Sequence, residues 1–256
     1  MEQRYVRGAL IVFEGLDRSG KTTQVNRLLQ DLEGTKERYP YRGMRFPDRT
    51  PANPINIEIC DYLSKKKELP AREAHLLFTK QRQNQKDEME RFLQNGTTLV
   101  VDRYSHSGAA YSAAKGLPLD WCMAQEEGLP KPDLVIFLDL FADIAKNRSG
   151  FGEERFEEEP FQKRVYEQYM QLQDETWLRV NASKTEEEIA AEVRQAVLRV
   201  IEECREKPIS HFGDKQEETN QLQLAVPHLP HHQCTPTKSQ QSSKEPGASL
   251  VGCEVK

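Results

Sequence analysis

Residues 9–22 read Ala-Leu-Ile-Val-Phe-Glu-Gly-Leu-Asp-Arg-Ser-Gly-Lys-Thr. Five apolar residues, Ala9 to Phe13, are followed by the pattern Gly-x-x-x-x-Gly-Lys-Thr from Gly15 to Thr22. A strand, such a loop and a helix over 23–32 together form a cradle of backbone N–H groups at the positive end of the helix dipole. The stretch therefore predicts a phosphate-binding loop (P-loop) that holds the phosphates of a nucleoside triphosphate.

The side chains of this loop have distinct expected roles. Gly15 and Gly20 allow the backbone to turn tightly and to approach a polyphosphate. Lys21 can reach the β- and γ-phosphates, and the hydroxyl of Thr22 can ligate Mg²⁺. We expect Mg²⁺, bound together with the triphosphate, as the cofactor.

Two further apolar runs, 98–101 and 134–138, resemble the run at 9–13 in having no polar alternation. Such runs are typical of strands that are covered on both faces, as in a parallel sheet. Long helical patterns separate them, so the sequence predicts an α/β fold with helices on both faces of the sheet. The ligand site of such a fold lies beyond the carboxyl ends of the strands.

Two helices have clear boundaries in the sequence. The segment 71–94 has apolar residues at helical spacing and ends at Asn95-Gly96, a common C-terminal stop. A last helix is predicted by apolar residues every fourth position from Ile189 to Ile201, after the capping-box pattern Thr185-x-x-Glu188.

The end of the second apolar run indicates the reaction class. Asp102 follows this run, where a carboxylate can reach the metal through water; the alternative is that it caps the next helix. Arg103 occupies the position at which hydrolytic ATPases usually carry a second acid, and an arginine there can bind a substrate phosphate instead. The sequence contains no Asn-Lys-x-Asp motif for guanine recognition. Phosphoryl transfer to an organic acceptor is therefore favoured over hydrolysis and switching.

Composition and charge restrict the partners and the compartment. A net charge of -5 argues against a nucleic-acid partner. Five scattered cysteines without CxxC spacing suit reduced thiols, and the N-terminus has neither a signal-peptide core nor a membrane-spanning run. We expect a cytoplasmic or nuclear protein without a membrane partner.

The last part of the chain differs in composition from the rest. From residue 212 to residue 256 it is rich in Gln, Ser, Thr, Pro and His, without periodic apolar residues, so we expect a disordered polar tail. Its His228, His231, His232 and Cys234 are not expected to hold a metal, because no rigid element fixes their geometry. The predicted domain spans residues 1–211.

Six segments in order carry a family resemblance. They are Phe-Glu-Gly-Leu-Asp-Arg-Ser-Gly-Lys-Thr at 13–22, Arg-Phe-Pro-Asp-Arg at 45–49, Leu-Leu-Phe-Thr-Lys-Gln-Arg at 76–82, Val-Asp-Arg-Tyr-Ser-His-Ser-Gly at 101–108, Leu-Pro-Lys-Pro-Asp-Leu at 129–134 and Phe-Gly-Glu-Glu-Arg-Phe-Glu at 151–157. Together they resemble thymidylate kinases of the eukaryotic-type branch, over most of residues 7–208. The resemblance implies a P-loop nucleoside monophosphate kinase fold with a parallel five-stranded sheet.

The resemblance implies an acceptor site for dTMP. Asp17 would orient the transfer, and Arg49 and Arg103 would hold the acceptor's monophosphate. Phe78 would stack on thymine and Arg82 would bond a base carbonyl, although an isolated Phe78 is more often plain core. The implied dTMP-binding residues are Asp17, Arg49, Phe78, Arg82, Arg103, Ser107, Gly108, Tyr111 and Gln162. Tyr111 would lie near C2′ and exclude ribonucleotides.

The resemblance also implies a donor site and a lid over about 148–159, a segment that would otherwise be interpreted as a surface loop. The implied ATP-binding residues are Gly15, Arg18, Ser19, Gly20, Lys21, Thr22, Thr23 and Arg148. The implied catalytic residues are Asp17, Arg18, Lys21, Asp102 and Arg155, with Thr22 and Asp102 at the metal. One departure from the family is Phe156, where relatives commonly have tyrosine, and the lid is one residue longer before Phe151.

From these observations we expect ATP-dependent phosphorylation of dTMP to dTDP in dTTP biosynthesis, by Mg²⁺-assisted in-line transfer. The resemblance further implies a homodimer. The alternatives are another nucleoside monophosphate or deoxynucleoside kinase on the same fold, and a non-catalytic nucleotide-binding regulator.

Overall fold

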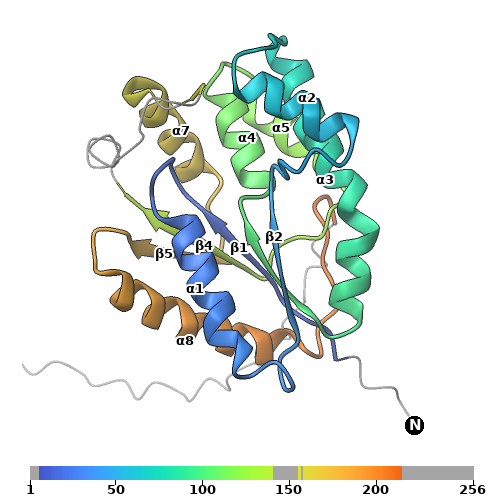
Figure 1. The fold of residues 1–256 in the computed structure, drawn as a ribbon, viewed down its shortest axis with the longest axis vertical. Helices are drawn as coiled ribbons and strands as arrows, with labels where there is room; N and C mark the ends of the chain where they lie inside the picture. The colour runs from blue at the N-terminus through green and yellow to red at the C-terminus, as the bar shows by residue number, and fades with distance from the viewer. Residues whose placement is uncertain (1–5, 141–154, 157, 215–256) are drawn as a thin grey trace, which may run out of the picture. The chain divides into compact units, whose positions relative to one another are not determined.

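The structure, a computed structural model, describes residues 6–140, 155–156 and 158–214. Its centre is a five-stranded sheet with the strand order β2-β3-β1-β4-β5, in which every neighbouring pair is parallel (Figure 1). The strands are β1 (Leu10–Glu14), β2 (Tyr41–Arg45), β3 (Thr98–Asp102), β4 (Leu134–Asp139) and β5 (Trp177–Asn181). The predicted parallel five-stranded sheet is confirmed.

Helices cover both faces of this sheet, as predicted. Alternate residues of β1 point to opposite faces, so Ile11 and Phe13 join one buried cluster while Leu10 and Val12 join another. The first cluster is completed by α1 (Lys21–Glu33) and α8 (Glu186–Cys204). The opposite face carries α3 (Ala71–Gln94), α4 (Ser105–Ala113) and α7 (Glu159–Gln171). The remaining helices are α2 (Pro54–Leu63) and α5 (Leu119–Ala124).

The two helix boundaries predicted from the sequence are confirmed. Helix α3 spans 71–94 and stops where Gly96 adopts a positive φ of 81°. Helix α8 begins with a complete capping box, in which Thr185 accepts from the Glu188 amide and the Glu188 carboxylate accepts from the Thr185 amide.

The P-loop connects β1 to α1 at the carboxyl edge of the sheet. Gly15 has a φ of 142°, and a Cβ atom there would lie 2.8 Å from the carbonyl oxygen of Leu138. Gly20, which precedes α1, has a φ of 96°. Both positions require glycine, so the loop can pass close to β4 and present its backbone at the end of the strands.

The packed domain extends beyond the predicted boundary at residue 211. The backbone of Phe212 exchanges hydrogen bonds with Gly128 and Leu129, and its ring packs against Tyr104 and His106. A single aromatic residue gives no periodic signal, which is why composition placed it in the tail. Residues 215–256, most of the predicted tail, lie outside the described residues. Within the described part of the chain, no helix is both long and apolar enough to cross a membrane.

Candidate active site

Lys21 lies inside the turn of the P-loop. Its ammonium group donates to the carbonyl oxygen of Leu16 at 2.6 Å and to the hydroxyl of Ser19 at 3.3 Å. Burial, together with the nearby charge of Arg103, lowers the pKa of Lys21 to about 7. The carboxylates of Asp17, Asp102 and Glu14 oppose this lowering, and a bound phosphate would add further negative charge that favours the protonated form. The predicted role of Lys21 at the phosphates therefore suits its surroundings.

Thr22 and Asp102 are adjacent, as the predicted metal site requires. The hydroxyl of Thr22, at the start of α1, donates to the carboxylate of Asp102 at the end of β3, with 2.6 Å between the oxygens. The N-cap residue of α4 is Tyr104, and its side chain makes no bond to the helix start. The alternative that Asp102 caps this helix is therefore wrong. One hydroxyl and one carboxylate are hard oxygen donors that suit Mg²⁺ when substrate phosphates and water complete its shell. Within the described residues, no cluster of three or more His, Cys, Asp or Glu could hold a metal by protein groups alone.

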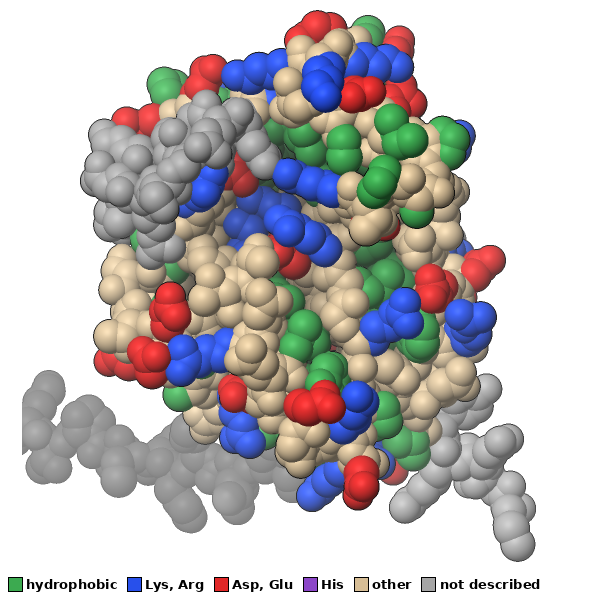
Figure 2. Space-filling view, in the orientation of Figure 1, with side chains coloured by type: hydrophobic (Ala, Val, Ile, Leu, Met, Phe, Trp, Pro, Cys, Tyr) green, Lys and Arg blue, Asp and Glu red, His purple; other side chains and the backbone are tan. Residues whose placement is uncertain are grey.

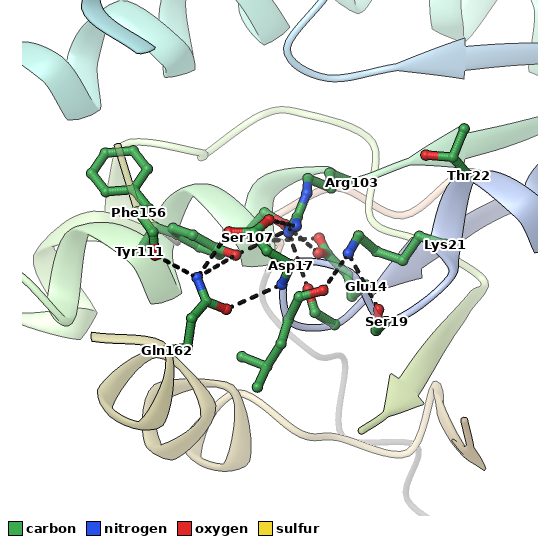
Figure 3. A network of polar contacts seen from close by, with 12 residues as sticks. Glu14, Asp17, Ser19, Lys21, Thr22, Arg103, Ser107, Tyr111, Phe156 and Gln162 are labelled. Atoms are coloured by element: carbon green, nitrogen blue, oxygen red, sulfur yellow. Dashed lines mark hydrogen bonds and ion pairs between the residues drawn. The ribbon is translucent and has the colours of Figure 1, made fainter. Parts of the chain in front are cut away.

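Asp17 joins the P-loop to the helices on the other side of the site (Figure 3). One carboxylate oxygen accepts from Nη2 of Arg103 at 2.5 Å, and the other accepts from the amide of Gln162 at 2.8 Å. Gln162 also accepts from the backbone N–H of Asp17 at 3.1 Å. Burial alone would raise the pKa of Asp17, but the charges of Arg103 and Lys21 hold it below its usual value. Asp17 is therefore an anion fixed between two cations.

Arg103 has the left-handed φ of 68° directly after β3. This conformation turns its side chain back toward the P-loop, where Nη1 donates to the carbonyl oxygen of Gly15 at 3.1 Å. Nη1 also donates to the hydroxyl oxygens of Ser107 at 3.1 Å and Tyr169 at 3.4 Å. The guanidinium lies over the ring of Tyr111, 5.2 Å from its centroid. Arg103 thus connects the phosphate loop with α4 and α7.

One pocket beside the P-loop brings the predicted acceptor residues together. Its lining includes eight of the nine: Asp17, Arg49, Phe78, Arg82, Arg103, Ser107, Gly108 and Tyr111. The ninth, Gln162, is not part of the lining, but its side-chain amide donates to Asp17, which is. In Figure 2, lysine and arginine side chains gather in a hollow near the centre of the visible face. The pocket is cationic and has an aromatic lining, so it suits a phosphorylated nucleoside.

Arg82 is held rigidly in the wall of this pocket by a residue that sequence reasoning missed. Glu126 is fully buried and accepts from Nε and Nη2 of Arg82 at 2.7 and 2.6 Å. Thr79 donates to the same carboxylate at 2.6 Å. A Cβ atom at Gly108 would lie 2.6 Å from Nη2 of Arg82, so glycine is needed for this approach. Glu126 and Arg82 are far apart in sequence, and no local pattern connects them.

The other wall of the pocket is aromatic. Phe156 packs against Tyr62 and Tyr111, with ring centroids at 6.1 and 5.8 Å, and stacks on Phe161 at 5.4 Å. The phenyl ring thus keeps the packing expected at this position without the hydroxyl group of a tyrosine. Lys115, which sequence reasoning also missed, lines the pocket with its ammonium 4.9 Å from the centroid of Phe156. Burial, helped by the charge of Arg155, lowers the pKa of Lys115 to about 8.

Arg155 is not brought to the P-loop in this structure. It donates to the carbonyl oxygens of Tyr62 and Lys67 and to both carboxylate oxygens of Glu68, at the C-terminal end of α2. Arg148 and most of the predicted lid over 148–159 lie outside the described residues. The catalytic role of Arg155 and the donor contact of Arg148 stay predictions.

The remaining donor-site residues lie in and directly after the P-loop. Arg18 is half-buried and has a left-handed φ of 62°. Ser19 is buried beside Lys21, whereas Thr23 is exposed on the first turn of α1. The transfer role of Arg18 stays a prediction.

Glu14 is the third site residue without an expected role. It ends β1 and is fully buried, and its carboxylate accepts from groups of both α4 and α7. In the sequence, Glu14 stands out only as a member of the segment 13–22. Its partners Tyr104, Ser107 and Tyr169 are distant in sequence, so no spacing could reveal the contact.

The P-loop follows β1 of a parallel five-stranded sheet, and a cationic pocket lies directly beside it. This arrangement is that of the P-loop nucleoside monophosphate kinases. Within this class, the family model described as Thymidylate kinase matches residues 13–193. The chain belongs to the thymidylate kinase family, as the six segments of the sequence predict.

Individual relatives agree with the family. The chain is 47% identical over 205 residues to a thymidylate kinase of Arabidopsis thaliana, covering 80% of this chain and 76% of the relative. It is 42% identical to a thymidylate kinase of Homo sapiens, covering 80% of this chain and 97% of the relative. A solved structure of thymidylate kinase from Candida albicans matches with a TM-score of 0.69 and 33% identity, over 76% of this chain and 92% of that one.

Proposed function

We propose that this protein transfers the γ-phosphoryl group of ATP to dTMP, giving dTDP for dTTP biosynthesis. The observation that carries the proposal is the bond between Asp17 and Arg103. It joins the P-loop, where ATP binds, to the pocket that contains the other acceptor residues. Membership of the thymidylate kinase family supports dTMP as the acceptor.

One group of site residues binds the donor ATP, and another group binds the acceptor dTMP. The P-loop backbone and Lys21 hold the ATP phosphates, and Arg18 stabilises charge on the transferring group. Arg49 and Arg103 hold the phosphate of dTMP, so that one of its oxygens points at the γ-phosphorus. Alignment of the two substrates lowers the barrier without covalent chemistry by the protein.

The base and sugar are recognised on the far side of the same pocket. Phe78 stacks on thymine, while Arg82, fixed by Glu126, donates to a base carbonyl. Tyr111 fills the space near C2′ and excludes a ribose hydroxyl. The Candida albicans relative is described as having a broad substrate specificity. A panel of acceptors is therefore needed to define the specificity of this chain.

Thr22 and Asp102 are the residues that would hold Mg²⁺, in Asp102's case through water. When bound, the ion neutralises charge on the phosphates of ATP. The segment 148–159, most of which lies outside the described residues, stays the predicted lid that would exclude water during transfer. We also propose that the protein is a cytoplasmic or nuclear homodimer.

The acceptor panel tests the proposed function directly. ADP release is measured with Mg-ATP and dTMP, dUMP, UMP, CMP or thymidine as acceptor. We expect kcat/KM to be highest for dTMP, with dUMP next, because the pocket fits a deoxynucleotide with a pyrimidine base. Equal rates with UMP or CMP, or transfer to thymidine but not to dTMP, would assign the chain to another kinase on this fold.

A further inference from the structure

The carboxylate of Glu14 caps α4 from a different element. The N-cap residue of α4 is Tyr104, whose side chain makes no capping bond. Instead, Oε1 of Glu14 accepts from the backbone N–H groups of Tyr104 and Ser107, each at 3.0 Å. These amides would otherwise lack an acceptor at the helix start. The end of β1 is thereby tied to the helix that carries Ser107.

The second oxygen of Glu14 fixes the direction of two hydroxyl groups. Oε2 accepts from Oγ of Ser107 and from Oη of Tyr169, the latter at 3.0 Å. A carboxylate can only accept, so both hydroxyl hydrogens point toward Glu14. The lone pairs of the two hydroxyl oxygens are then available on their other side.

Those lone pairs face the guanidinium of Arg103. Nη1 donates to Ser107 at 3.1 Å and to Tyr169 at 3.4 Å, and the same group reaches the carbonyl oxygen of Gly15. Figure 3 shows Glu14, Ser107 and Arg103 in one connected network next to Asp17. An arginine can only donate, so these bonds exist only while both hydroxyl hydrogens are directed elsewhere.

We propose that Glu14 is a positioning residue for the acceptor phosphate: by orienting the hydroxyls of Ser107 and Tyr169, it fixes Arg103 in the direction that binds dTMP. This inference rests on the proposed function. Glu14 is a buried carboxylate outside the lining of the acceptor pocket.

The substitution Glu14→Gln changes one atom and reverses this polarity. The amide oxygen stays on the two α4 backbone amides, because an amide nitrogen there would face two fixed donors. The amide nitrogen therefore faces both hydroxyls and donates to them. The hydroxyl oxygens of Ser107 and Tyr169 are 2.8 Å apart, so one of the two hydroxyl groups can donate its hydrogen to the other. The hydrogen of the remaining hydroxyl group is left pointing at Arg103. The guanidinium must then rotate away or lose its acceptors.

The test compares the binding of dTMP and thymidine by calorimetry, with wild-type protein and E14Q. Thymidine lacks the phosphate that Arg103 holds, so its affinity reports the rest of the pocket. We expect E14Q to weaken dTMP about tenfold, a typical loss for a bond to a charged group, and thymidine less than about twofold. In turnover, KM for dTMP should rise while KM for ATP stays within about twofold.

A matched control is Glu126→Gln, which also replaces a fully buried carboxylate, in this case one paired directly with Arg82 in the pocket wall. Glu126 holds Arg82, which contacts the base, so E126Q should weaken the binding of dTMP and of thymidine by the same factor. If E14Q likewise weakened both equally, or neither, the positioning role would be refuted. Wild-type protein that does not bind dTMP would refute the proposed function and, with it, this inference.

A second variant keeps the inference testable if E14Q does not fold. Ser107→Ala leaves the charge of Glu14 and both of its backbone bonds to α4 intact. It removes the nearer of the two hydroxyl oxygens that accept from Arg103. We expect the preference for dTMP over thymidine to fall about threefold, a smaller loss because the oxygen of Tyr169 remains. An unchanged preference in S107A would overturn the proposal.

Discussion

Asp17 belongs both to the P-loop, where ATP is proposed to bind, and to the lining of the acceptor pocket. An acid inside a P-loop would repel the phosphates of ATP, yet here its charge is matched by Arg103 and Lys21. The acid therefore orients Arg103 rather than opposing the nucleotide, since Nη2 of Arg103 is bound to it directly. The same carboxylate also receives the amide of Gln162 from α7.

Replacing Asp17 with Asn keeps the volume and removes the charge. We expect kcat with dTMP to fall about 100-fold or more, the size of loss typical of an electrostatic group at a phosphoryl-transfer site. The Kd of ATP should change less than about threefold, because the P-loop backbone is intact. Asp174→Asn, at a turn before β5, is the matched control and should retain wild-type turnover. Unchanged turnover in D17N would contradict the role of this acid.

Lys115 gives the protein a specific dependence of stability on pH. Burial lowers its pKa from an ordinary value of 10.5 to about 8 in the folded state. Between pH 8 and 10.5 the unfolded chain binds more protons, so stability rises with pH in this window, and the cost of the buried ammonium is fully present below pH 8.

The variant Lys115→Met lacks this titration. From pH 7 to pH 10.5, the free energy of unfolding of the wild type should therefore rise relative to that of K115M by roughly 2–3 kcal/mol, at ~1.4 kcal/mol per pKa unit. Urea unfolding of both proteins across this range measures the difference. A constant difference would mean that the ammonium is solvated.

The sequence predicted the acceptor residues one at a time but not the contacts that arrange them. The position of Arg103 after the second apolar run predicts its phosphate contact, whereas Asp17 and Ser107 are implied by the family resemblance of the segments 13–22 and 101–108. The carboxylates behind them, Glu14 and Glu126, were missed because their partners lie on other elements. Only tertiary packing brings such groups together.

At the scale of elements, a helix or strand was predictable where its own sequence has a clear apolar pattern or a capping motif. The apolar runs found β1, β3 and β4, and the caps found α3 and α8. The edge strand β2 reads Tyr-Arg-Gly-Met-Arg and has no buried residue, so it produced no apolar run. The five-strand count came from the family resemblance rather than from the pattern.

The segment 209–214 forms a strap against residues 128–131 and helix α3. Its backbone bonds to Gly128, Leu129 and Lys131, and Phe212 packs with Ile209 against the cluster that contains Tyr104. His211 also bonds Glu90 on α3 at 2.9 Å. The strap therefore supports the turn from which Arg103 projects.

Two truncations test the strap. A chain ending at residue 214 should match the full chain in stability and turnover, whereas one ending at 208 should lose about 2–4 kcal/mol of unfolding free energy, from the packing of Phe212 and Ile209. Phe212→Ala should account for part of this loss, about 1–3 kcal/mol. Equal urea midpoints for the 208 and 214 chains would contradict the structural role of the strap.

At the scale of the whole molecule, the exposed apolar surface bears on the proposed homodimer. Ile57 on α2 and Leu76 on α3 are large hydrophobic side chains that are 48% and 43% exposed. Hydrophobic side chains also gather at the upper right of Figure 2, where Figure 1 places these helices. Exposed apolar patches of this kind are common at subunit interfaces.

Sedimentation measures the oligomeric state directly. The wild type should have twice the chain mass of 29.5 kDa at micromolar concentration. Leu76→Glu and Ile57→Glu should shift it toward the monomer, because a charge would be buried at the interface. Val6→Glu is the control, since Val6 is similarly exposed at 44% but lies outside both helices. A monomeric wild type, or dimers in both helix variants, would reject this surface as the interface.

The strand order has a consequence for how the protein is made. β1 lies in the middle of the sheet, but Leu10 pairs with Leu99 on one side and Ile11 pairs with Leu134 on the other. A ribosome adds roughly 5–20 residues per second, so this apolar strand waits several seconds before its first pairing partner, β3, is synthesised. During translation, the strand that leads into the phosphate loop is therefore an exposed apolar segment, of the kind that chaperones protect from aggregation.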